Sequence, residues 1–84
     1  MMIFVAPRAT QAEVEAAVQR ADIVGEVTVE PDDWPGFAWQ ITLWYYNDFD
    51  RIVSSIRDSL PHVRVATLNE LEAERTGNPF VEYL

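Results

Sequence analysis

The chain offers few residues that could do chemistry, and its only histidine is His62. An imidazole works as a general base when a nucleophile and an orienting partner lie beside it, and the sequence indicates neither. Asp48 and Asp50 have the spacing of two calcium ligands, but Ile52 stands where a third oxygen ligand is needed. We therefore interpret the two aspartates as helix-capping residues. We expect no enzyme activity, no catalytic residue, no metal site and no cofactor.

The strongest compositional feature is a net charge of −8, from fourteen acidic and six basic residues, all six of them arginine. Such a surface repels nucleic acid and anionic membranes, so we expect it to bind neither. A basic surface on another protein is the natural complement, although acidity also serves solubility. The bias to arginine, alanine and valine suggests a GC-rich bacterial or phage genome.

The length and residue usage predict one domain spanning residues 1–84. The hydrophobic content of 49% is that of a globular protein. The N-terminal segment lacks the basic region of a signal peptide, and no apolar run is long enough to span a bilayer. With no cysteine in the chain, we expect a cytoplasmic protein.

Apolar and alternating runs predict strands at residues 2–6, 23–30, 37–46 and 62–66. Two capping boxes, which begin at Thr10 and Thr67, predict the starts of a first and a third helix. A second helix begins at Asn47 or Asp48 and ends before Pro61. The order βαββαβ predicts a two-layer, ferredoxin-like α+β sandwich. Its four-stranded antiparallel sheet would have the order 4-1-3-2, with two main helices on one face, then a short C-terminal helix and an extended tail.

Arg8, in the segment 6–10 after the first predicted strand, has a position similar to that of the arginine in acylphosphatases, which share this architecture. The acylphosphatase loop is rich in glycine, and segment 6–10 contains none. The resemblance therefore does not extend to the catalytic motif.

The third predicted strand is unusually aromatic. With a period of two, one face carries large apolar residues, which we expect to meet the helices. They are Phe37, Trp39, Ile41, Leu43 and Tyr45. The other face begins small and polar and ends in Trp44 and Tyr46. Aromatic residues on an otherwise polar sheet face indicate a contact surface.

The sheet face away from the helices should have an apolar centre, because the first strand is apolar on both sides. Three alternatives could cover that centre: the C-terminal tail with Phe80 and Leu84, a second copy of the chain, or another protein. Trp34, near the tip of the hairpin, could be a binding anchor, but we favour a tryptophan folded back on the core. The predicted partner-binding residues are Trp44, Tyr46, Glu26, Glu30, Asp32, Asp33 and Trp34.

These observations predict a non-catalytic protein-interaction module. In size and charge the chain resembles the small acidic inhibitors of phages and toxin-immunity systems, including anti-CRISPR and DNA-mimic proteins. The alternative is a homodimeric α+β barrel with a small-molecule pocket, similar to small monooxygenases and isomerases. A regulatory subunit of a larger assembly is a third interpretation.

Overall fold

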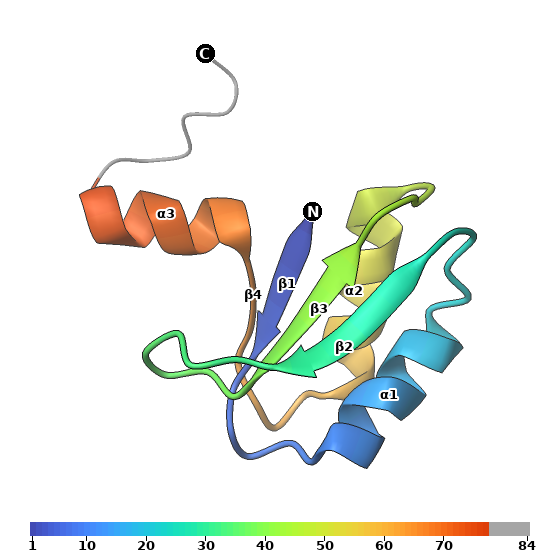
Figure 1. Cartoon of the computed structure of the whole chain (residues 1–84), viewed down its shortest axis with the longest axis horizontal. Helices are drawn as coiled ribbons and strands as arrows, with labels where there is room; N and C mark the ends of the chain where they lie inside the picture. Colours follow the sequence, from blue (N-terminus) through green and yellow to red (C-terminus); the bar gives the residue numbers. More distant parts are fainter. Residues whose placement is uncertain (78–84) are drawn as a thin grey trace.

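The computed structural model describes residues 1–77, so the predicted tail at 78–84 lies outside the described residues. Four strands and three helices follow one another in the predicted order (Figure 1). They are β1 (Met2–Val5), α1 (Gln11–Arg20), β2 (Val27–Pro31), β3 (Trp39–Leu43), α2 (Phe49–Ser59), β4 (Val65–Thr67) and α3 (Leu68–Thr76).

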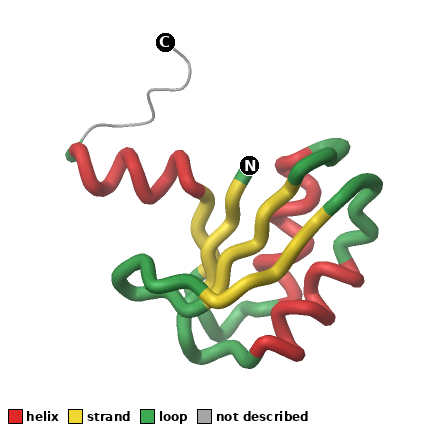
Figure 2. The backbone as a smooth tube through the Cα atoms, in the orientation of Figure 1, coloured by secondary structure: helices red, strands yellow, loops and turns green. Residues whose placement is uncertain are grey.

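The strands form one antiparallel sheet in the order β2-β3-β1-β4, which confirms the predicted α+β fold and strand order. Helices α1 and α2 lie together on one side of the sheet, and α3 lies apart from them (Figure 2). The predicted capping boxes at Thr10 and Thr67 are present, and each threonine side chain accepts a hydrogen bond from the N–H of the glutamate three residues on. Asp48 caps α2 by accepting from the N–H of Arg51.

The main core fills the space between the sheet and the helices α1 and α2. Ile3 and Val5 of β1, with Ile41 and Leu43 of β3, supply its sheet side. The helices supply Val14, Ala17, Val18, Ile52, Val53 and Ile56. Trp39 packs against this core, and its indole N–H donates to the carbonyl of Ala9 at 2.8 Å.

A second, smaller core lies on the opposite face of the sheet, beneath α3. Phe4 is its centre, with its ring 5.4 Å from that of Trp34 and 5.9 Å from that of Phe37. Leu71 of α3 and Ala66 of β4 complete the cluster. Trp34 therefore folds back on the core, as we expected, and α3 covers part of the apolar centre predicted on this face.

Two aromatic residues of the third predicted strand do not lie where the alternating pattern placed them. Phe37 belongs to the second core instead of the helix-facing one, and Tyr45 is exposed to solvent. The reason is that β3 is shorter than predicted. The N–H of Phe37 donates to the carbonyl of Trp34 in the turn before β3, and the regular strand ends at Leu43.

Candidate protein-interaction surface

The most exposed large apolar side chains in the described part of the chain gather at one end of the sheet, where β2 begins and β3 ends. Val24, Trp44 and Tyr45 are 68%, 59% and 71% exposed, and Tyr46 is 43% exposed. We call this group of four the aromatic end. Met1 borders it, because its backbone exchanges hydrogen bonds with that of Leu43.

Backbone contacts between two loops hold the aromatic end in place. Gly25 approaches Tyr45 so closely that a Cβ at position 25 would lie 2.0 Å from the Tyr45 carbonyl oxygen. The N–H of Trp44 donates to the carbonyl of Glu26 at 2.9 Å, and the N–H of Val24 donates to the side chain of Asn47 at 3.3 Å. These bonds tie the two loops together and hold the backbone that carries the exposed rings.

Tyr46 is not on the sheet face where the alternating pattern placed it. Its ring lies 5.7 Å from the ring of Phe49, at the start of α2, and Phe49 packs against the main core. Trp44 instead continues the ladder opposite Glu26. Trp44, Tyr45 and Glu26 line a shallow hollow of about 350 Å³.

Negative charge is concentrated on the segment that contains the β2–β3 hairpin, its flanking loops and the start of α2. The segment 21–50 contains no arginine and seven acidic residues: Asp22, Glu26, Glu30, Asp32, Asp33, Asp48 and Asp50. Among residues 1–77, no ion pair of the structure involves this segment. The guanidinium of Arg51 bonds the carbonyls of Ala21 and Asp22, and the backbone N–H of Arg51 donates to the side chain of Asp48.

The predicted partner-binding residues do not form one patch. Glu26 lies beside Trp44, while Asp32, Asp33 and Trp34 belong to the opposite end of the hairpin, roughly 20 Å away along β2 by the rise of a strand. Glu30 is exposed between the two ends. The carboxylate oxygen Oδ2 of Asp32 is buried and has no hydrogen-bond partner within the described residues.

Sequence reasoning missed Val24 and Tyr45. Gly25 and the capping signal at Asn47 and Asp48 were the available clues, because both interrupt a regular strand. Side chains next to such an interruption no longer alternate between the two faces of the sheet.

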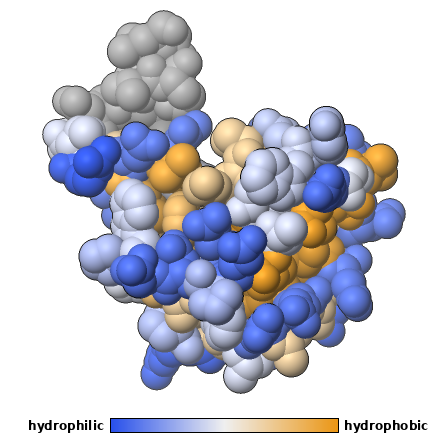
Figure 3. All heavy atoms as spheres, viewed as in Figure 1, coloured by the Kyte–Doolittle hydropathy of each residue, from blue (hydrophilic) through white to orange (hydrophobic). Residues whose placement is uncertain are grey.

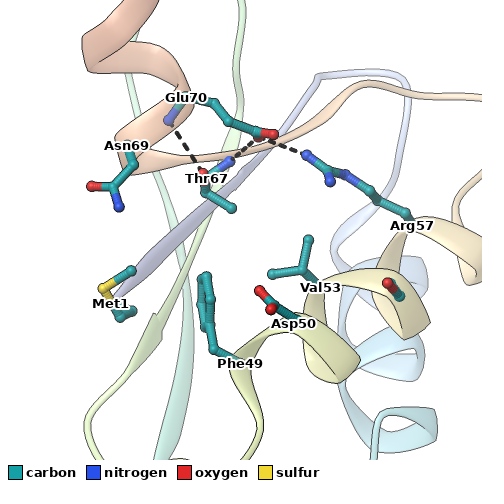
Figure 4. Close-up of a pocket in the computed structure, with 9 residues that line it drawn as sticks. Met1, Phe49, Asp50, Val53, Arg57, Thr67, Asn69 and Glu70 are labelled. Carbon is teal, nitrogen blue, oxygen red and sulfur yellow. Dashed lines mark hydrogen bonds and ion pairs between the residues drawn. The ribbon is translucent and has the colours of Figure 1, made fainter. Parts of the chain in front are cut away.

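Two further hollows lie in the described part of the chain. One of about 380 Å³ lies between α2 and the start of α3 (Figure 4), where Arg57 points toward Glu70 with 2.6 Å between nitrogen and oxygen. Glu70 also accepts from the N–H of Thr67 at 2.8 Å, so these charges serve the helix start. A hollow of similar volume lies between Trp34 and α3, with Arg64 above the ring of Phe37.

His62 lies on the surface with its Nε2 atom 3.8 Å from a carboxylate oxygen of Glu13, which belongs to the first capping box. The pKa of Glu13 is lowered, first by the hydrogen bond from the backbone of Thr10 and to a smaller extent by His62. A search of residues 1–77 finds no group of three or more side chains that could hold a metal ion. Within the same range, no helix is long and apolar enough to cross a membrane.

Comparison of this chain with protein-family models, with curated proteins and with solved structures finds no match.

Proposed function

We propose that this protein is a small, acidic, non-catalytic module that binds a basic surface of another protein. The observation that supports this function best is the coincidence of the aromatic end with a hairpin whose acidic residues have no ion-pair partner in residues 1–77. The few residues that carry most of the energy at protein interfaces are enriched in tryptophan, tyrosine and arginine, while surrounding charge accelerates association and selects the partner.

In this proposal the residues have different tasks. Trp44 and Tyr45 enter pockets of the partner, with Val24 beside them. Glu26 and Glu30 face basic side chains, and Asp32 and Asp33 extend the negative field along the hairpin. Trp34 acts through the fold, because its ring packs on Phe4. An inhibitor from a phage or a defence system is one protein class with this combination of size, charge and exposed aromatic residues.

The packing of α3 argues against the homodimeric barrel as the alternative. Such barrels pair open sheet faces around a pocket, and here Leu71 of α3 and the rings of Trp34 and Phe37 lie on the face that would have to open. On the part of this face over β2 and β3, Glu26 and Glu30 would repel their counterparts in a second copy.

The test is photo-crosslinking in a lysate of the source organism, with a benzophenone amino acid at position 24. The control carries the same group at Asp58, an exposed position on α2. We expect one or a few basic proteins to crosslink from position 24 only. We expect the yield to fall as salt rises from 50 to 500 mM, because the Debye length shortens about threefold over that range.

The double variant Trp44→Ala/Tyr45→Ala should lose the position-24 crosslink while keeping its far-UV circular dichroism. A matched variant, Glu15→Gln/Asp58→Asn, removes two exposed acids elsewhere and should keep the crosslink. If the folded aromatic variant crosslinks to the same proteins in the same yield, the proposed surface is wrong.

A further inference from the structure

Among residues 1–77, the outer edge of β2 carries backbone groups that do not bond to another strand. β2 is the last strand in the order, and β3 is the described strand that pairs with it. The bonds from Trp44 to Glu26 and from Asp32 to Ala38 mark the even-numbered residues of β2 as those that bond β3. In an antiparallel ladder the N–H and C=O groups of the residues between them point the other way. Those of Val27 and Val29 therefore point out of the sheet.

At the opposite edge of the sheet, side chains bond the outward backbone groups of β4, unlike those of β2. The outward carbonyl of Val65 in β4 accepts from Nε and Nη2 of Arg57 at 3.1 and 3.0 Å. The N–H of Thr67 donates to Glu70, and β4 then ends in α3. For the outer edge of β2, no equivalent side-chain bond to Val27 or Val29 is found in the part of the chain that the structure describes.

The side chains along this edge add an apolar rim and an acidic face. Val27 and Val29 are half-buried against the main core, and Figure 3 shows a hydrophobic strip along the course of β2. Glu26 and Glu30 are exposed on the other face of the strand, on either side of Thr28. An added strand would therefore meet apolar groups on one face and two carboxylates on the other.

A second copy of the chain is a poor occupant for this edge. Antiparallel pairing of two β2 strands about Thr28 would bring Glu26 of each copy opposite Glu30 of the other. Like charges directly opposite one another destabilise a strand pair, and each chain carries a net charge of −8. The acidic residues thus protect the edge from self-association and select for a partner strand of opposite charge.

We propose that β2 receives an extended, basic segment of the partner protein as a fifth strand of the sheet. This inference rests on the proposed function and specifies the form of the partner. The segment has five residues in contact, in the order basic, apolar, any, apolar, basic. Its basic residues face Glu26 and Glu30, and its apolar residues lie beside Val27 and Val29. Pro31 limits the length, since it has no N–H to donate.

The test uses a fluorescein-labelled peptide with the core Lys-Val-Thr-Val-Lys flanked by Gly-Ser on both sides, measured by fluorescence anisotropy at low salt. A second peptide carries N-methyl groups on both valines, which removes the two N–H groups that would donate to β2 while the charge is kept. We expect N-methylation to weaken binding by about thirtyfold, as the loss of two net hydrogen bonds predicts. Amide NMR shifts should move along β2 first.

The protein variants separate this inference from the proposed function. The variant Glu26→Gln/Glu30→Gln should bind the unmodified peptide about tenfold more weakly than the wild type does. The matched variant Glu15→Gln/Asp58→Asn should bind it with unchanged affinity. If the two peptides bind with equal affinity, strand addition is wrong; the acidic surface is still supported if the Glu26→Gln/Glu30→Gln variant binds the peptide more weakly. If neither N-methylation nor the glutamate substitutions change the affinity, strand addition and the acidic surface are both wrong. No binding of the unmodified peptide at about 1 mM also overturns strand addition, because a specific site of this kind should exceed that affinity.

Discussion

Replacing Gly25 by alanine tests the backbone geometry that holds the aromatic end. Gly25 has a φ of +137°, a conformation that side chains rarely allow, and the new Cβ would lie 2.0 Å from the carbonyl oxygen of Tyr45. Carbon and oxygen atoms approach normally to about 3.3 Å, so the two loops would have to separate by about 1.3 Å.

The magnitude follows from what that separation breaks. The backbone strain itself costs about 1–2 kcal/mol. The bonds from Trp44 to Glu26 and from Val24 to Asn47 cross the same contact, and each contributes about 1 kcal/mol. We therefore expect Gly25→Ala to lower the free energy of unfolding by about 3–4 kcal/mol, out of roughly 4–13 kcal/mol for a domain of this length.

The matched control is Gly36→Ala, since Gly36 has a φ of +89° with no atom within 4 Å of the added Cβ. It should cost about 1–2 kcal/mol, the strain alone. Urea unfolding followed by circular dichroism and by tryptophan fluorescence measures both variants. Equal losses for the two alanine variants would show that the close approach of Gly25 to Tyr45 does not exist, and the preformed aromatic end would lose its physical basis.

Two further predictions concern stability. Arg57→Met should lower the free energy of unfolding by about 1–2 kcal/mol, because it removes the bonds to Val65 and the partly exposed ion pair with Glu70, and high salt should shrink that loss in a urea titration. The lowered pKa of Glu13, caused first by the backbone N–H of Thr10, means that its carboxylate stabilises the folded state above its ordinary pKa of 4.5, and that this stabilisation is lost as pH falls through the lowered value. The difference in urea midpoint between wild type and Glu13→Gln should therefore be larger at pH 7 than at pH 3, and a constant difference would contradict the role of the charge.

The fold could be predicted because its determinants are local. The capping boxes at Thr10 and Thr67 mark two helix starts, and Pro61 ends the helix between them. Strand order then follows from the few topologies that right-handed crossovers allow.

The sheet face on which each aromatic side chain lies could not be predicted, because it depends on which residues form the last hydrogen-bonded pairs of β2 and β3. The pair Asp32 and Ala38 is the last one of the hairpin, and the turn that begins there sends Phe37 to the other face. At the other end, Gly25 meets Tyr45 across a gap of twenty residues, a contact that no periodic pattern encodes. The sequence therefore predicted Trp44 and Glu26 as part of the surface but left out Tyr45.

In the described residues, four of the six arginines contact groups other than the acidic side chains of the hairpin. Arg57, Arg64 and Arg75 pair with glutamates of α3, so three of the six bases serve the helix that covers the second core. Arg51 is bound to backbone carbonyls at the end of α1. Arg57 and Glu70 thus close the β4 edge, while the charged residues that flank Thr28 on β2 are both glutamates, Glu26 and Glu30. A partner that approaches from the β2 side meets an attractive field only if it is basic, and one that approaches β4 meets an edge already closed. Within residues 1–77, the distribution of charge that stabilises α3 is therefore consistent with the proposed extension of the sheet at β2.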